Sequence, residues 1–235
     1  MATDMHKYTA KELDELFSSN ALERIGMGSR RSCYRLPCGK LCVKCYRSDE
    51  EILEGKDPGK PDSRPLVPAA AKEIQHFRFE EHRNTCCQEY HYWKNLPEDI
   101  RRYFPATIEM LNTATRGWSL IEELILNDDG SPIVKFLPAW RTSDGEERQQ
   151  LAALLDEFEA ALARHSIRFF DPQTIMVQRT SEGLRLRIPD FEPTTRTLIP
   201  IDALLPIFSR MKMRRRFVRY RKTLGIKCKI TASRE

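Results

Sequence analysis

The sequence has no stretch close to the roughly 20 consecutive apolar residues that a membrane-spanning helix needs. Its start, MATDMHKYTAKELDELF, carries acidic side chains where a secretory signal peptide has an apolar run. Internal repeats and coiled-coil heptads are also absent. These absences argue against a transmembrane, secreted or repeat protein. We expect a soluble, cytoplasmic protein, with the periphery of the inner membrane as a second location.

The cysteines do not have the pattern of a secreted disulfide framework. Their number, seven, is odd, and Cys86 and Cys87 are adjacent within a helical segment. The spacing C-x4-C-x3-C-x2-C leaves a zinc or iron–sulfur site as an alternative for Cys33, Cys38, Cys42 and Cys45. Because Cys42 and Cys45 are an odd number of residues apart on a predicted strand, they should point to opposite faces. Small buried hydrophobic side chains are the simpler interpretation.

Positive charge is concentrated at the C-terminus. The net charge is +5, but residues 210–235 hold eleven Lys/Arg and one acid, a local balance of +10 that leaves −5 on the rest. Such an arm favours an anionic partner, such as acidic lipid, nucleic acid or the acidic face of a protein. The alternative is a solvated amphipathic helix whose arginine stems lie along apolar surface.

Two interpretations of the segment MKMRRRFVRYRK stay open. Phe217 and Tyr220 alternate with arginines, as in proteins that stack bases on aromatic rings. In the other interpretation, an apolar face with Ile207, Met211 and Val218 packs on the rest of the protein. We consider nucleic acid the less favoured partner.

The first third of the chain predicts a helix followed by strands. Thr9 and Glu12 have the spacing of a capping box and predict a helix to about Ser18. The stretch 22–47 predicts two strands around a glycine turn. The stretch 48–68 is rich in Asp, Glu, Gly, Lys and Pro and predicts a mobile insertion.

The rest of the chain alternates helical and strand patterns. Composition predicts two helices over 69–96 that meet near Asn84. The remaining elements follow from apolar periodicity and turn residues. They are strands at 106–112 and 117–126, a long amphipathic helix at 146–165, a hairpin of strands at 175–178 and 184–188, and a last helix at 201–224.

Two glycines and a lysine in the first hairpin indicate a phosphate site. Gly26 and Gly28 form a GxG, and glycine can take backbone angles that bring main-chain N–H groups close to a phosphate. Lys44 lies near the end of the second predicted strand, where its ammonium can meet the same phosphate. A GxG alone is a weak signal, because glycine turns are common in hairpins.

The order of the elements resembles that of a protein-kinase-like fold. In that fold a strand lysine holds the α and β phosphates of ATP, and a carboxylate from the first helix fixes the lysine. The resemblance gives these roles to Lys44 and Glu89, with Glu73 or Glu80 as the fallback if the helix register differs. It also makes Glu123 part of the hinge that reads adenine, although a plain strand explains that segment equally well.

Several motifs resemble the bacterial PhoP regulatory network protein YrbL family, a divergent kinase-like group. IGMGSRRSCYRLPCGKLCVKCY is similar to its glycine loop and CQEYHYWKNL to its glutamate helix. FFDPQTIMV stands where the family has a Leu-Lys-Pro-Gln-Asn-Ile loop, and IPDFEPTT where it has a metal-binding aspartate. The resemblance covers residues 22–230 and implies a link to PhoP-type envelope regulation.

The chain departs from an active kinase at the catalytic loop. Phe169 stands at the position of the catalytic Asp, and Thr174 at that of the Mg²⁺-binding Asn. Asp171 is the candidate acid or base instead, and its alternative role is a turn residue before Pro172. Asp190 follows an apolar strand, as in the DFG motif, and is the candidate Mg²⁺ ligand. An ion pair with a nearby arginine is the alternative for Asp190.

We therefore predict an α+β, protein-kinase-like, two-lobed domain with a small β-rich N-lobe and a reduced helical C-lobe. Its parts are an N-terminal helical appendage (1–21), an N-lobe (22–126) that contains the insertion, and a C-lobe (127–235) with the basic helix. We expect it to bind ATP and Mg²⁺ between the lobes. It would act as an atypical phosphotransferase on a small-molecule, sugar or lipid-linked acceptor. The alternative is a pseudokinase, a regulatory module that binds a nucleotide or a partner without catalysis.

Overall fold

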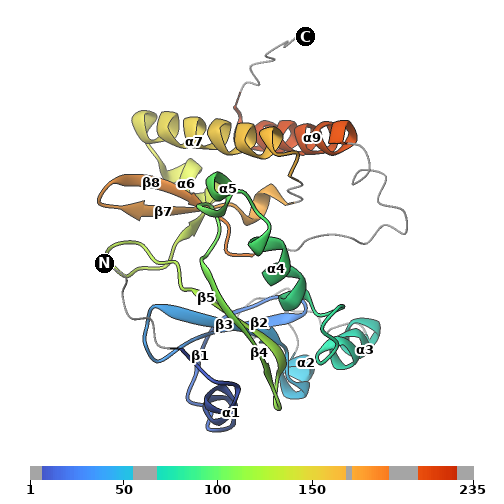
Figure 1. Cartoon of the computed structure of the whole chain (residues 1–235). Coiled ribbons are helices and arrows are strands. Elements are labelled where there is room, and N and C mark those ends of the chain that lie inside the picture. Colours follow the sequence, from blue (N-terminus) through green and yellow to red (C-terminus); the bar gives the residue numbers. More distant parts are fainter. Residues whose placement is uncertain (1–6, 55–67, 168–170, 191–205, 227–235) are drawn as a thin grey trace. The chain divides into compact units, whose positions relative to one another are not determined.

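The computed structural model describes residues 7–54, 68–167, 171–190 and 206–226. It is an α+β protein, as predicted (Figure 1). The chain divides into two compact units. The first comprises Met1–Asn95 with Ala106–Leu124, and the second comprises Leu96–Pro105 with Ile125–Glu235. Among the described residues, none of the helices combines the length and the hydrophobicity needed to span a bilayer.

Helix α1 (Ala10–Ser18) begins with the predicted capping box. The Glu12 N–H donates to Oγ1 of Thr9 at 3.2 Å, and the Thr9 N–H donates to Oε2 of Glu12 at 2.7 Å. These bonds satisfy N–H groups that the start of a helix leaves without a partner. The helix contributes Leu13 and Phe17 to a core cluster of the first unit, so α1 is packed into that unit.

The first unit is built on an antiparallel sheet with the strand order β1-β2-β3-β5-β4. Its strands are β1 (Glu23–Met27), β2 (Arg31–Arg35), β3 (Leu41–Tyr46), β4 (Thr107–Thr113) and β5 (Gly117–Glu123). The prediction of two strands over 22–47 is wrong, because the chain turns twice there. At the second turn Gly39 has a φ of +70°, and its N–H donates to the Leu36 carbonyl at 2.9 Å. Lys44 therefore lies on a third strand.

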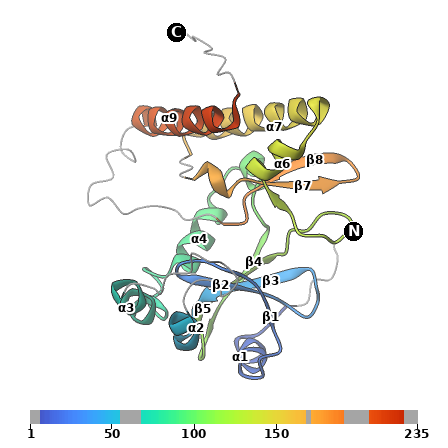
Figure 2. The ribbon, with the colours of Figure 1, turned by 180° about the vertical axis from the view of Figure 1, so that it is seen from behind.

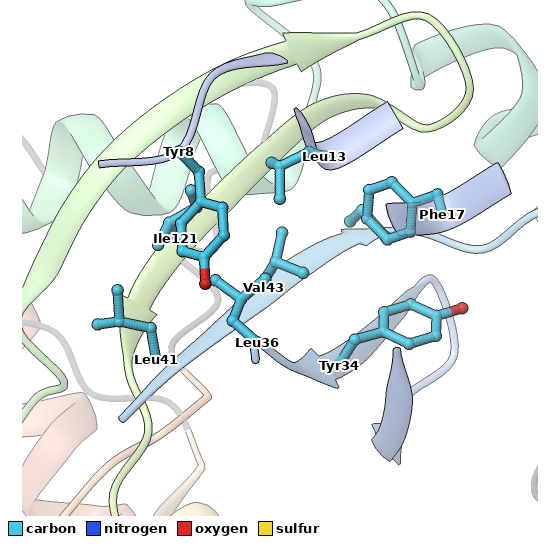
Figure 3. Close-up of a cluster of buried hydrophobic side chains, with 9 residues drawn as sticks. Tyr8, Leu13, Phe17, Tyr34, Leu36, Leu41, Val43 and Ile121 are labelled. Carbon is cyan, nitrogen blue, oxygen red and sulfur yellow. The ribbon is translucent and has the colours of Figure 1, made fainter. Parts of the chain in front are cut away.

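The strand register gives this sheet one apolar face. Tyr34 pairs with Val43 and Val43 with Ile121, so the three side chains project from the same side. They form a buried cluster with Leu13 and Phe17 of α1 (Figure 3). Residues at the alternate positions of β2, β3 and β5 project from the opposite face, and the candidate site is built from them.

Three helices follow β3 in the first unit: α2 (Asp49–Glu54), α3 (Pro68–Phe77) and α4 (Thr85–Lys94). Helix α2 corrects the prediction that all of 48–68 is an irregular insertion, and 55–67 lie outside the described residues. Helices α3 and α4 confirm the prediction of two helices over 69–96. Asn84, at the predicted junction, caps α4 by accepting the Cys86 N–H at 2.8 Å.

The second unit contains a three-stranded sheet of order β6-β7-β8 and two long helices. Its elements are α5 (Glu98–Arg101), β6 (Val134–Lys135), α6 (Phe136–Thr142), α7 (Gly145–Arg164), η1 (Pro172–Thr174), β7 (Met176–Thr180), β8 (Gly183–Arg187) and α9 (Pro206–Leu224). The long helix, the hairpin and the last helix confirm the predictions, except that 201–205 lie outside the described residues. Helices α5 and α6 and strand β6 are too short for sequence periodicity to predict.

Helices α7 and α9 overlap along part of their length in both views (Figure 1, Figure 2). Phe158 of α7 meets Phe217 of α9 edge to face, with ring centroids 6.1 Å apart. Among the described residues of α9, the buried apolar side chains recur every three or four residues and are Met213, Phe217, Tyr220 and Leu224. Because Phe217 and Tyr220 are buried, neither ring is available to stack on a base.

The predicted apolar face of the last helix has the wrong phase. Met211 is 47% exposed and Val218 is 43% exposed, whereas the stripe that packs begins at Met213, two residues later. The side chain of Ile207, the third residue of that prediction, lies outside the described part of the chain. Helix α9 thus packs its apolar stripe against the rest of the second unit and presents Met211 and Val218 to solvent.

Candidate functional site

Lys44 lies at the centre of the candidate site, on β3 in the middle of the five-stranded sheet. Its Nζ is 3.1 Å from Oε1 of Glu89 and 2.7 Å from Oε1 of Glu122. The lysine and both glutamates are buried. A buried ammonium is therefore held by two carboxylates, one from α4 and one from β5.

The strand register and the start of α4 explain this meeting. Lys44 pairs with Leu120, so Glu122, two residues further along β5, projects from the same face. Glu89 comes from the second turn of α4, and near the start of that helix the Cys86 thiol donates to the Lys44 carbonyl across 3.5 Å. The structure thus brings together Lys44 and Glu89, the pair expected from the sequence.

The fallback residues for Glu89 lie elsewhere. Oε1 of Glu73 is 3.0 Å from the Arg30 guanidinium, and Oε1 of Glu80 is 3.2 Å from Nε2 of His76. The partner of Lys44 on the helix is therefore Glu89, and neither fallback residue takes its place.

Sequence reasoning missed two members of the cluster, Glu122 and Arg31. Arg31 is buried and donates to Oε2 of Glu89. It lies two residues before Cys33, which pairs with Lys44, so strand alternation places it on the same face. Glu122 follows from the same alternation along β5. Neither residue follows from the sequence alone, because strand alternation identifies them only once the strands and their register are known.

The four side chains of this buried cluster, Arg31, Lys44, Glu89 and Glu122, have formal charges that cancel when both carboxylates are ionised. Burial raises the pKa of Glu122 to about 7, and Glu89 acts in the same direction while Lys44 opposes it. A proton on Glu122 leaves the cluster with one net positive charge. Protonation of Glu122 therefore changes the charge of this cluster.

The backbone of the two glycines in the first hairpin differs from the prediction that they adopt angles closed to other residues. Neither Gly26 nor Gly28 has a left-handed φ. A Cβ at Gly28 would lie 3.6 Å from the Arg31 carbonyl oxygen, and one at Gly26 would lie 3.9 Å from the Cys33 Cβ, both ordinary contacts. Gly28 donates its N–H to the Arg31 carbonyl at 2.7 Å and so closes a tight hairpin turn. The phosphate-binding role of these glycines stays a prediction.

The cysteines of the sheet lie on both of its faces, as predicted. Cys45 belongs to the apolar cluster beneath α1, whereas the Cys42 thiol donates to Oε1 of Glu122 across 3.8 Å on the other face. A hydrogen bond with Cys33 and burial raise the pKa of the Cys42 thiol, and burial raises that of Cys45. Metal ligation requires thiolates, which these surroundings disfavour. Within the described ranges, no three His, Cys, Asp or Glu side chains gather as metal ligands.

Glu123, the residue expected in an adenine-reading hinge, ends β5. Its N–H donates to the Ala106 carbonyl at 2.9 Å, and its Oε2 accepts the Ala106 N–H at 3.0 Å. The next N–H, of Leu124, donates to the Lys40 carbonyl at 2.9 Å. These two N–H groups bond within the sheet, and adenine recognition at Glu123 stays a prediction.

The candidate catalytic and metal residues belong to the second unit. Oδ1 of Asp171 accepts the Gln173 N–H at 2.9 Å, which caps the short helix η1. This is the turn role that was the alternative for Asp171. Asp190 is exposed near the end of its described segment, and Phe169 lies outside the described residues. The acid–base role of Asp171 and the metal role of Asp190 stay predictions.

Comparison of the sequence with models of protein families finds no match, and comparison with curated proteins finds no significant similarity.

Proposed function

We propose that the first unit binds the phosphates of ATP, with Mg²⁺, through Lys44, in a protein-kinase-like domain related to the YrbL family. The observation that supports this proposal is the buried ion pair between Lys44 and Glu89. Kinases fix the phosphate-binding lysine of their third strand with a carboxylate from the first helix of the small lobe. Lys44 lies on β3, and Glu89 lies on a helix between β3 and β4, in the same order along the chain.

The charge of the cluster supports an anionic ligand. While both carboxylates are ionised, the four side chains of the cluster have no formal net charge to attract a phosphate. A proton on Glu122 lowers the negative charge beside Lys44 and Arg31, which favours a bound anion. Binding of a phosphate would in turn be linked to proton uptake by Glu122.

In this proposal the glycine hairpin contributes less to phosphate binding than the sequence predicts. Because Gly26 and Gly28 have backbone conformations open to other residues, phosphate binding rests on the Lys44 side chain more than on an unusual loop. Mg²⁺ would be supplied with the nucleotide, and Asp190 is the residue assigned to it.

A regulatory module without catalysis is the second candidate function, and the contacts of Asp171 favour it. This carboxylate is already bonded as a helix cap, and the sequence has Phe169 where kinases have the proton acceptor. An atypical phosphotransferase with a small-molecule, sugar or lipid-linked acceptor would require Asp171 to leave the cap. The two candidates share the nucleotide site and differ only in turnover.

Thermal denaturation with ATP and Mg²⁺ tests the shared site. Saturating nucleotide should raise the melting temperature by roughly 5–10 °C, since a ligand at a hundred times its Kd adds about 2.7 kcal/mol of stability. Lys44→Met should abolish the shift, and Asp190→Ala should abolish the part that depends on Mg²⁺. Lys40→Met changes an exposed lysine of the same hairpin region and should leave the shift unchanged.

The outcomes separate the proposals. No shift in the wild-type protein, or an equal shift in Lys44→Met, would overturn nucleotide binding at this site. If the shift behaves as expected, release of ADP with candidate acceptors distinguishes the two functions. Turnover lost in Asp171→Asn supports the phosphotransferase, whereas binding without turnover supports the regulatory module.

A further inference from the structure

We propose that the outer face of α9 is a docking surface for an anionic lipid bilayer. This inference concerns the second unit and does not depend on nucleotide binding by the first. The name basic face is used below for the exposed cations on the outer side of α9, which are Lys212, Arg214, Arg215, Arg219 and Lys222.

The basic face lies opposite a well-anchored side of the helix. Arg221, the one buried cation of the helix, pairs with Asp156 and Glu159 of α7 at 2.6 and 2.8 Å. The indole N–H of Trp140 donates to the Leu224 carbonyl at 2.9 Å. With the buried stripe from Met213 to Leu224, these contacts fix the rotation of α9 about its axis. The exposed side chains are thus held as one surface.

The exposed stripe mixes charge with apolar side chains. Met211, Arg215, Val218 and Lys222 have the spacing i, i+4, i+7 and i+11, so they follow one another along one side of the helix. All four are exposed. Of the six exposed large hydrophobic side chains among the described residues, two are on this stripe. Helix α9 contains no Asp or Glu between Pro206 and Leu224, so nothing within the helix offsets its charge.

A bilayer surface fits this combination better than a nucleic acid does. Both partners offer phosphates to Lys and Arg. Single-stranded nucleic acid would also use exposed aromatic rings, but Phe217 and Tyr220 face the protein interior. Met211 and Val218 are aliphatic and project between cations, which suits the boundary between lipid headgroups and acyl chains. The structure therefore favours a membrane containing acidic lipids.

Co-sedimentation of the full chain with vesicles tests the proposal. We expect binding to phosphatidylcholine vesicles that contain phosphatidylglycerol, little binding to pure phosphatidylcholine, and weakening by salt. The test variant must lose cations only from the basic face, so it combines Arg215→Gln, Arg219→Gln and Lys222→Gln. Each cation contributes roughly fivefold, so the triple variant should bind roughly a hundredfold more weakly.

A matched control keeps net charge and the number of substitutions the same. Lys7, Lys11 and Lys40 are exposed residues of the first unit, and changing all three to Gln lowers the net charge from +5 to +2, as the first triple variant does. This control should retain vesicle binding within about twofold if local charge decides. Equal losses in the two triple variants would show that only net charge matters and would overturn the assignment to α9.

A second variant separates lipid from nucleic acid. Met211→Ser with Val218→Ser leaves every charge in place and should weaken vesicle binding severalfold, while binding to a mixed-sequence RNA stays unchanged. Vesicle binding unaffected by these substitutions, combined with tighter binding to RNA than to acidic vesicles, would replace the lipid with a nucleic acid. No binding to acidic vesicles at low salt would overturn the proposal. Circular dichroism confirms that each variant is folded.

Discussion

Two glutamates of the first unit are almost equally buried but have opposite electrostatic surroundings. Glu51, on α2, is 4% exposed, and Glu122, on β5, is 2% exposed. The pKa of Glu51 is lowered to about 2, whereas that of Glu122 is raised to about 7. Burial alone raises the pKa of any carboxylate, so the partners of the two side chains must account for the difference.

Glu51 is surrounded by hydrogen-bond donors. The Ser48 N–H donates to Oε2 at 2.8 Å, the Tyr34 hydroxyl donates to Oε1, and the Arg116 and Arg24 guanidinium groups pair with the same carboxylate. Burial raises the pKa of this carboxyl, but these donors favour its ionised form more strongly. A carboxylate with this many partners stabilises the fold and has little capacity for a ligand.

Glu122 has fewer donors and shares its main one. Lys44 also pairs with Glu89, and the other contact of the Glu122 carboxylate is a thiol of Cys42 at 3.8 Å, a weak donor. A buried carboxyl with a raised pKa beside a shared cation is typical of functional sites. The comparison teaches that the supply of donors, rather than burial, distinguishes a structural carboxylate from a candidate functional one.

The largest expected effect is on stability at Glu51. Glu51→Gln should lower the free energy of unfolding by about 3 kcal/mol, because it leaves the largely buried Arg116 guanidinium without its carboxylate partner. Urea denaturation followed by circular dichroism measures the loss. Glu54→Gln is the control on the same helix: its side chain pairs with Arg24 at 3.0 Å but is 47% exposed, so it should cost less than about 1 kcal/mol. Equal losses would remove the distinction that we draw for Glu51.

The two glutamates should also give opposite pH dependence of stability. The raised pKa of Glu122 makes a contribution that is complete below its unfolded value of 4.5 and is lost as the pH rises through about 7. The lowered pKa of Glu51 makes a contribution that is present above 4.5 and is lost as the pH falls toward 2. Relative to the wild type, Glu122→Gln should therefore gain on the order of 2 kcal/mol between pH 5 and 8. A gain independent of pH would contradict the proton assigned to Glu122.

The local structure around Glu51 was within reach of the sequence. Ser48 and Glu51 have the same capping-box spacing as Thr9 and Glu12, and their reciprocal bonds are present: Glu51 N–H to Ser48 Oγ at 3.2 Å and Ser48 N–H to Glu51 Oε2 at 2.8 Å. The first box lies before an apolar periodic run and predicts α1. The second lies in a stretch rich in Gly and Pro, and that composition hides a helix of six residues.

The surroundings of Glu122 could not be predicted without knowledge of the fold. The resemblance to a kinase-like fold predicts Lys44 and Glu89 as a pair, but it does not show which of the two glutamates at 122 and 123 faces the lysine. That choice depends on the pairing of Lys44 with Leu120, a contact between residues far apart in the chain. The sequence could not predict which side of α9 packs for a related reason. Two apolar stripes are available on that helix, and only tertiary packing selects Met213 over Met211.

The interaction between Lys44 and Glu122 can be measured directly. A double-mutant cycle with Lys44→Met and Glu122→Gln should give a coupling energy of about 1 kcal/mol above pH 7, where Glu122 is ionised. The coupling should shrink below pH 5, where the carboxyl is neutral. A cycle of Lys40→Met with Glu122→Gln serves as the control and should show additive effects. Coupling that does not change with pH would mean that charge is not what joins the pair.

The smallest expected effect on stability is at Gly28, and it tests whether side chains or loop backbone define the site. Gly28→Ala should change the free energy of unfolding by less than about 0.5 kcal/mol, because the new Cβ meets the Arg31 carbonyl oxygen at an ordinary 3.6 Å. Gly117→Ala, with a φ of +67° and a Cβ 2.3 Å from the Arg78 carbonyl oxygen, should be strongly destabilising and calibrates the measurement. If Gly28→Ala is stable and still binds ATP, the Lys44 cluster carries the binding. If the variant is stable but no longer binds ATP, the phosphate needs the close approach of the backbone that only glycine permits. The hairpin is then part of the site together with the cluster.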